Sequence, residues 1–302
     1  MFDALSPLQA AAFGAVLQRL TLEDQRRIEG LAGAAAEAAI AASRTGSFGA
    51  SAEAVDALLG RDAPGALRRG LIASWACELP TRAAAQDLPP EITANYAEWV
   101  DRLAAFLTSA EGAYDVDFWA KDVRFALALS VPSTRTQVID LQSRLGPGDV
   151  VRHARGGRGW EVLAAYVSAR GWGSWLEVHT EARELSDFNE AGWDKAWMAA
   201  AAILRRRPEL RGMMGSSWFY DPPLEQISPR LAYLRLNPTR NGAFMIHQGP
   251  GEIHTERAAA SPGSRRAMIE SGQYLPRSWI VAWPRTALLR WADARAELAQ
   301  AA

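Results

Sequence analysis

Cysteine is almost absent from this sequence, which has a single one, Cys77, among its 302 residues. One cysteine excludes an internal disulfide framework and is typical of proteins that work in a reducing compartment. Because its neighbours Trp75, Ala76 and Leu79 are apolar, we expect Cys77 to be a small buried residue and not a nucleophile.

An excess of either charge is also missing, since 33 lysines and arginines nearly balance 34 aspartates and glutamates. This balance gives no general attraction to nucleic acid or to an anionic membrane. The sequence has no apolar run long enough to cross a bilayer, and its first residues lack the basic and apolar segments of a secretory signal. We therefore expect a cytoplasmic protein without nucleic-acid or membrane partners.

No catalytic signature of high specificity is present. The segment 215–219 does not match the Gly-x-Ser-x-Gly pattern of serine hydrolases, and no phosphate-loop or dinucleotide signature occurs. What the sequence does have is a globular composition, with 49% hydrophobic and 22% charged residues. Candidate chemistry must therefore be sought in local clusters of polar residues.

The chain changes character near residue 112. Residues 1–111 are almost entirely helical in pattern and carry no candidate chemistry, whereas residues 112–302 alternate between strands and helices. The alternation predicts strands at 175–179, 213–220, 243–247 and 278–283, with a loop at 249–263. We therefore predict an α+β protein: a helical N-terminal region followed by a mixed β-sheet flanked by helices.

The first candidate site is the end of the strand at 175–179. His179 and Glu181 are two residues apart, so on a strand both side chains would face the same way. This spacing fits a general base with an orienting carboxylate. It also fits two ligands of a metal site, for which His247 or His254 would be the third ligand. Both interpretations stay open, and no metal is favoured.

The second candidate is the segment 212–235, which is dense in aromatic and polar residues. On the predicted strand 213–220, Ser216, Trp218 and Tyr220 would share one face, with Ser217 and Phe219 on the other. Tyr220 and Asp221 at the strand's end are plausible proton donors or acceptors. The alternative is that Asp221 opens a proline turn that Tyr220 anchors.

Two further segments are candidate anion sites. Asn189 can cap a helix that begins near residue 190, and exposed amides at a helix start can bind a phosphate or carboxylate. The loop Arg155–Gly159 places two arginines among glycines, which let backbone amides approach an anion. Capping and a plain basic loop are the alternative interpretations of these two segments.

Five segments together resemble a family of uncharacterised bacterial proteins. The resemblance covers roughly residues 115–292 and implies no particular activity. It is carried by His179–Arg183, Phe188–Trp193, Ser217–Pro222, Ile227–Arg235 and Trp283–Arg285.

The order of predicted elements from residue 175 to 247 resembles the acyl-CoA-binding half of GNAT-type N-acyltransferases. In that family the loop after the fourth strand holds a pyrophosphate with an Arg/Gln-x-x-Gly-x-Gly/Ala pattern. The corresponding loop here, Thr180–Gly192, has Arg183 and Gly192 without the full pattern. The loop 155–159 could instead hold the pyrophosphate, in a shifted register. The resemblance implies acyl transfer from a thioester to an amine, with backbone amides at a splayed strand polarising the carbonyl.

The leading prediction is therefore an acyltransferase-like enzyme that uses acyl-CoA or another acyl thioester and a small amine or amino-acid-like substrate. The resemblance implies Glu181 or His179 as the base and Tyr220 or Tyr233 as the acid. Arg155, Gly157 and Gly159 would bind the cofactor. The predicted substrate-binding residues are Arg183, Asn189, Trp193, Ser217, Trp218, Asp221 and Arg230. One alternative is a metal-dependent oxygenase or hydrolase that uses His179 and Glu181 with His247 or His254. The other alternative is a non-catalytic module whose tryptophans form a ligand or partner surface.

Overall fold

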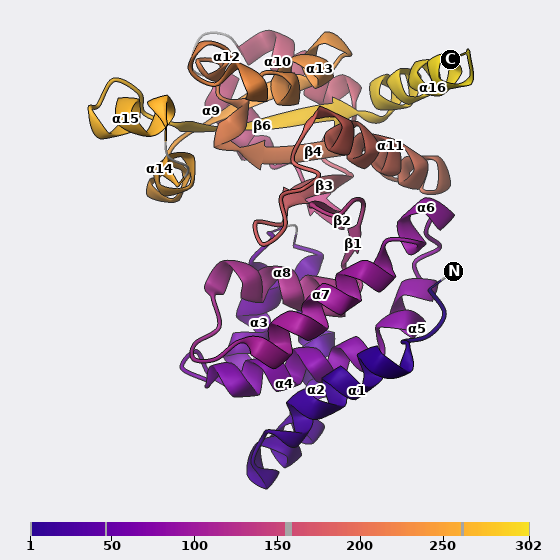
Figure 1. The fold of residues 1–302 in the computed structure, drawn as a ribbon. Coiled ribbons are helices and arrows are strands. Elements are labelled where there is room, and N and C mark those ends of the chain that lie inside the picture. Colours follow the sequence, from indigo (N-terminus) through magenta and orange to yellow (C-terminus); the bar gives the residue numbers. More distant parts are fainter. Residues whose placement is uncertain (1, 46, 155–158, 261–262, 302) are drawn as a thin grey trace. The chain divides into compact units, whose positions relative to one another are not determined.

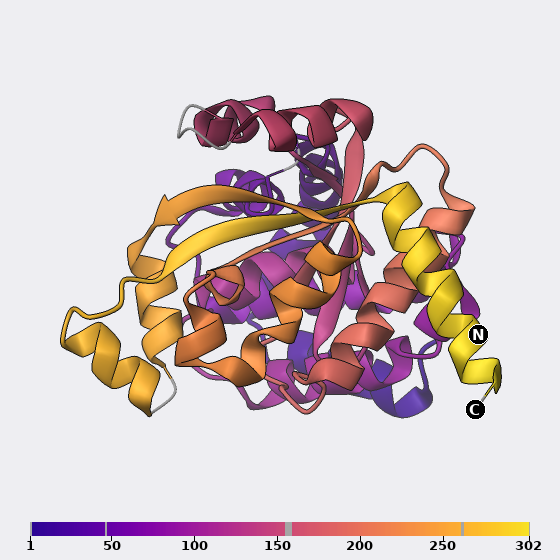
Figure 2. The same ribbon diagram turned by 90° about the horizontal axis from the view of Figure 1, so that it is seen from above.

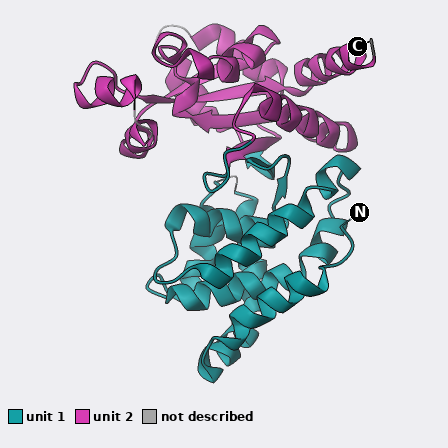
Figure 3. Ribbon diagram, in the orientation of Figure 1, with its two compact units in different colours: residues 1–143, 181–186 teal, residues 144–180, 187–302 magenta. Residues whose placement is uncertain are grey.

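A computed structural model describes residues 2–45, 47–154, 159–260 and 263–301 (Figure 1). The predicted fold class is confirmed: a helical N-terminal region precedes a mixed β-sheet flanked by helices. The chain divides into two compact units, residues 1–143 with 181–186 (unit 1) and residues 144–180 with 187–302 (unit 2; Figure 3). The domain boundary near residue 112 stays a prediction.

Unit 1 is mainly helical and ends in a short antiparallel strand pair. Its strands are β1 (Ser130–Pro132) and β2 (Gln137–Arg144), joined in register from Ser130↔Asp140 to Pro132↔Val138. Its helices are α1 (Pro7–Gln18), α2 (Leu22–Ser43), α3 (Ala50–Leu59), α4 (Gly65–Cys77), α5 (Leu79–Ala84), α6 (Pro90–Thr93), α7 (Tyr96–Ser109) and α8 (Val116–Ala126).

The starts of these helices follow from their capping residues. Ser6 and Gln9 form a capping box at the start of α1, and Asp115 accepts hydrogen bonds from two amides at the start of α8. The expectation that Cys77 is buried is wrong, because it lies exposed at the end of α4 while Trp75 and Ala76 face the core. Partial desolvation of the sulfur by neighbouring atoms, together with the charge of Glu78, still raises the pKa of its thiol above the ordinary value.

The described part of unit 2 carries four strands: β3 (Ser174–Thr180), β4 (Gly212–Ser217), β5 (Phe244–Pro250) and β6 (Arg277–Pro284). Its helices are α9 (Pro147–His153), α10 (Gly159–Ser168), α11 (Glu190–Arg206), α12 (Leu224–Ile227), α13 (Tyr233–Arg240), α14 (Glu252–Ala259), α15 (Ser264–Glu270) and α16 (Arg285–Ala301), with 3₁₀ turns η2 (Trp218–Tyr220) and η3 (Pro229–Leu231). No described helix combines the length and the apolar character needed to cross a membrane.

The strands of unit 2 lie in the order β3-β4-β6-β5, and the sheet is mixed because β3 and β4 are parallel while the other pairs are antiparallel. Helices α9 and α10 cover one face, where Trp175 and Tyr166 join the core (Figure 2). The other face packs against α11 and α16 through tryptophans, with Trp197 edge-on to both Trp283 and Trp291.

Two of the predicted boundaries in unit 2 are wrong. The strand predicted at 213–220 ends at Ser217, because the Ser217 side chain accepts a hydrogen bond from the Phe219 amide and starts η2. Trp218 and Tyr220 therefore do not alternate on a strand face. The predicted loop 249–263 contains helix α14.

Candidate active site

Strands β3 and β4 separate before either one ends. Their parallel ladder has two register pairs, Leu176↔Met213 and Glu177↔Met214. Both strands are fully described, and each continues for three residues beyond this ladder without a further pair between them. Over those residues β4 remains paired with β6, as far as Ser217↔Trp279. The sheet therefore opens between the carboxyl ends of two parallel strands, which is where open sheets commonly bind ligands.

The hydroxyl group of Tyr220 lies at the start of this divergence. A Cβ atom at Gly215 would lie 2.8 Å from the Tyr220 Oη and 3.5 Å from the carbonyl oxygen of Val178. Gly215 thus leaves the space that the tyrosine hydroxyl needs. Burial, together with the charge of Glu177 and the neighbouring Tyr233, raises the pKa of Tyr220 above its ordinary value. The phenol consequently holds its proton at neutral pH.

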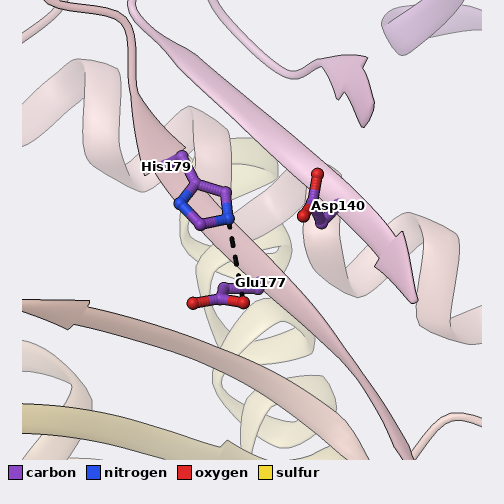
Figure 4. Close-up of side chains that lie close together, drawn as sticks. All are labelled: Asp140, Glu177 and His179. Atoms are coloured by element: carbon purple, nitrogen blue, oxygen red, sulfur yellow. Dashed lines mark ion pairs between the residues drawn. The ribbon is translucent and has the colours of Figure 1, made fainter. Parts of the chain in front are cut away.

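Glu177 and His179 lie on the same face of β3, two residues apart (Figure 4). The His179 Nε2 and the Glu177 Oε2 are 3.8 Å apart, and the two side chains are 18% and 12% exposed. Asp140, drawn in the same figure, belongs to unit 1, where it forms an ion pair with Arg124. The carboxylate that the structure places beside His179 in unit 2 is therefore Glu177, which the sequence prediction did not name.

Tyr233 contributes a second phenol near the first. Its hydroxyl is buried and has no hydrogen-bond partner among the described residues. Burial is the main cause that raises the pKa of Tyr233, with smaller contributions from Glu190 and Asp194. Since Tyr233 also raises the pKa of Tyr220, the two phenols are electrostatic neighbours.

Asp221 is a structural anchor in this part of unit 2. It is 1% exposed and accepts hydrogen bonds from the Tyr274 hydroxyl at 3.1 Å and the Trp279 indole at 3.0 Å. The Arg277 amide also donates to it, at 3.2 Å. These donors fix η2, and with it Tyr220, against strand β6. The predicted role of Asp221 in substrate binding stays a prediction.

The predicted substrate-binding residues near η2 have different surroundings. Ser217 caps η2, and Trp218 packs under the guanidinium of Arg265 at 4.7 Å. Arg265 in turn donates hydrogen bonds to the carbonyl of Ala258 and the hydroxyl of Ser228. Arg230 is exposed.

The start of α11 shows capping geometry, as the sequence predicts. The Asn189 side chain accepts a hydrogen bond from the Gly192 amide at 2.9 Å, and Glu190 lies in the first turn. Trp193 follows, fully buried, with its ring near Phe188 and Phe219. Its indole nitrogen has no partner among the described residues.

Glu181 and Arg183 belong to unit 1, where they join a buried charge cluster. Arg183 donates hydrogen bonds to Asp122 at 2.6 and 2.9 Å and to Glu181 at 3.0 and 3.1 Å, and it packs over the rings of Phe106 and Phe118. The Tyr114 hydroxyl donates to Asp122 at 2.6 Å. Burial raises the pKa of Glu181, but Arg183 and Lys121 lower it more, so the net pKa is lowered.

The remaining candidate residues, for cofactor binding and for a metal site, are not brought together in one place in the described part of the chain. Arg155 and Gly157 lie outside the described residues, while Gly159 begins α10 close to Ala154. His247 lies on β5 beside Trp279, and burial lowers the pKa of His254 on α14. Across the described residues, no group of three potential metal ligands contains Glu181, His247 or His254.

Comparison with known proteins gives structural matches only. No protein-family model matches the chain, and no curated protein sequence does. Similar solved structures include an acyltransferase in complex with decanoyl-CoA and teicoplanin, at a TM-score of 0.55. A mutant acyltransferase with octanoyl-CoA and an acyltransferase with CoA and 10C-teicoplanin both give 0.54. Each is 12% identical, over 94% of this chain and 86% of its own.

The chain has an acyltransferase-like fold. At this identity the likeness concerns the fold and does not transfer a substrate or a catalytic residue. The more specific GNAT resemblance stays a prediction.

Two residues at the divergence, Glu177 and Gly215, were missed by sequence reasoning. The signal for Glu177 was present, because strand alternation places it on the same face as His179. Gly215 had no such signal, since its importance depends on a tyrosine hydroxyl that η2 turns back toward β4.

Proposed function

We propose that this protein is an acyltransferase that moves an acyl group from a thioester, such as acyl-CoA, to a small amine or amino-acid-like substrate. The observation that carries the proposal is the divergence of β3 from β4 with the Tyr220 hydroxyl at its opening. The acyltransferase-like fold supports it independently.

In the proposed reaction the amine nitrogen attacks the thioester carbonyl carbon, and the carbon–sulfur bond then breaks. A base must take a proton from the amine, and an acid must protonate the departing thiolate. His179 is the proposed base, because it lies beside the Glu177 carboxylate, which stabilises the imidazolium that forms. Main-chain amides at the divergence would polarise the carbonyl.

Tyr220 is the proposed acid. Its raised pKa keeps the phenol protonated, as a donor to a thiolate requires, and the Asp221 contacts hold η2 in place. Glu181 is the weaker candidate for the base, since its carboxylate is occupied by Arg183. Tyr233 is the second candidate for the acid.

The test combines binding with turnover. We expect acyl-CoAs to raise the melting temperature of the purified protein and to release free thiol in the presence of small primary amines. Tyr220→Phe should lower kcat by about 10²-fold, as loss of one acid–base group does, with little change in the thermal shift. Tyr166→Phe, in a buried tyrosine that donates to the Leu145 carbonyl, is the matched control and should retain activity.

Gly215→Ala tests the position of the Tyr220 hydroxyl without removing it. The new methyl group would displace the Tyr220 hydroxyl, so activity should fall even though the tyrosine is still present. Absence of both thermal shift and thiol release across donors and amines would contradict the proposed function. Full activity of Tyr220→Phe would contradict only the assignment of the acid.

A further inference from the structure

A groove of about 870 Å³ lies in unit 2, bounded by α10, the end of α13 and one side of α16. It lies at the opposite end of the sheet from the divergence. Pro284, in its lining, pairs with Gly212 at the start of β4, whereas the divergence occurs along the last three residues of that strand. The groove is therefore distinct from the proposed active site.

One face of α16 forms a side of this groove. The residues it contributes recur at helical spacing of three and four positions, which places them in a single row. They are Thr286, Ala287, Arg290, Trp291, Ala294, Arg295 and Leu298. Asp293 and Glu297 are not in the row, and Asp293 pairs with Arg205 on α11. The helix thus presents its cations, and not these two acids, to the groove.

The groove carries an uncompensated positive charge. Arg240, Arg290 and Arg295 line it, and none of the described residues in its lining is acidic. Arg295 is paired with Asp194 at 2.6 Å. Neither Arg240 nor Arg290 has an ion-pair partner in the part of the chain that the structure describes. Two guanidinium groups therefore remain to bind an anion, which arginine does with two parallel hydrogen bonds to a carboxylate or phosphate.

The rest of the lining is largely apolar. Trp291 and the alanines of α10 and α16 form this part, and Leu298 is 65% exposed at its edge. Apolar surface adjoining unpaired cations suits a ligand with an anionic head and an apolar chain. An inorganic anion would leave the apolar part uncovered, and a neutral lipid would leave the arginines unpaired.

We propose that this groove binds an amphipathic anion, in which a carboxylate or phosphate head contacts Arg240 and Arg290 and an apolar chain lies along Trp291, Ala294 and Leu298. The site is independent of the proposed acyl transfer, because it shares no residue with the divergence.

Calorimetric titration of the full chain tests the proposal with four probes: octanoate, octyl phosphate, acetate and octanol. Octanoate, octyl phosphate or both should bind saturably, while acetate, which has the head alone, and octanol, which has the chain alone, should bind much more weakly. The ratio of the two amphipathic affinities distinguishes the head groups.

The double variant Arg240→Gln/Arg290→Gln should weaken binding of the amphipathic anion at least tenfold and leave the melting curve unchanged, since both side chains are exposed. Arg205→Gln, which removes an exposed arginine outside the groove, should bind as the unmodified chain does. Absence of saturable binding by both amphipathic probes, or binding that survives the double variant, would overturn the proposal. Acetate binding as tight as octanoate would reject the role of the apolar lining.

Discussion

Tyr233 shows that a single buried group can oppose stability. Its hydroxyl is buried without a partner among the described residues, and leaving a buried hydroxyl unpaired costs about 1–3 kcal/mol. Tyr220, whose hydroxyl lies at the divergence, is the acid that we favour for the proposed reaction. The two tyrosines can therefore be separated by experiment.

We expect Tyr233→Phe to raise the free energy of unfolding by about 1 kcal/mol, because the unpaired hydroxyl is removed while the ring is kept. Urea denaturation measures this change. Activity should persist if Tyr220 is the acid. A less stable variant would show that the hydroxyl has a hydrogen-bond partner in solution, such as water.

His153 makes stability depend on pH. Its Nδ1 accepts a hydrogen bond from the His247 amide at 3.1 Å, and burial and His247 lower its pKa from the ordinary value of 6.5. Below that value the unfolded chain binds a proton that the folded chain does not, so stability falls as the pH falls toward the folded pKa. Protonation of Nδ1 would also remove the acceptor that joins α9 to β5.

We therefore expect the free energy of unfolding to decrease as the pH is lowered from about 7.5 to 5, and to decrease less in His153→Asn. Asparagine has an acceptor oxygen and does not titrate. Denaturation at a series of pH values measures the difference, and His254, whose pKa is also lowered, contributes equally to both proteins. If the free energy of unfolding depended on pH identically in the unmodified chain and in His153→Asn, His153 would not be the source of the pH dependence.

At the scale of elements, the start of α11 depends on a glycine. A Cβ atom at Gly192 would lie 2.0 Å from the carbonyl oxygen of Asp187, although the helical backbone itself would tolerate alanine. Gly30 in α2 is the matched case, because a Cβ there would meet nothing within 4 Å. We therefore expect replacement by alanine to have opposite effects on stability at the two positions.

Gly192→Ala should destabilise the protein by about 1–3 kcal/mol through overpacking, whereas Gly30→Ala should stabilise it by about 0.5–1 kcal/mol. Thermal denaturation of both variants checks the pair. Equal effects would show that the Asp187 turn moves aside at little cost.

Sequence patterns predicted those elements whose signals are local. Asn189 caps its helix as expected, and the strand predicted at 175–179 is β3. The end of β4 could not be predicted in this way, because a serine side chain competed with strand pairing. Nor could the surroundings of Arg183, whose partner Asp122 is 61 positions away.

The whole chain is affected by the way residues 181–186 fold with unit 1. Asp122 and Glu181 are nearly buried, and Arg183 is the cation that both carboxylates contact. Removing one partner of a buried ion pair leaves an uncompensated charge, which costs about 3–5 kcal/mol. The stability of unit 1 therefore depends on a segment that follows strand β3.

Arg183→Ala should lower the free energy of unfolding by about 3–5 kcal/mol, and Arg183→Lys, which keeps the charge without the planar fork, should lower it less. Urea denaturation followed by circular dichroism measures both. Arg205→Ala, at an exposed pair, is the control and should change stability by less than about 1 kcal/mol. An equally small effect of Arg183→Ala would show that the cluster is hydrated in solution.

Because residues 181–186 belong to unit 1, this unit is completed late during synthesis of the chain. Residues 1–143 are synthesised before residues 144–180, and at about 5–20 residues per second the synthesis of residues 144–180 takes roughly 2–8 s. Until residues 181–186 emerge, the Asp122 carboxylate has no guanidinium from Arg183 to meet. The nascent helical unit must therefore wait, incomplete, for the third strand of the chain to be synthesised.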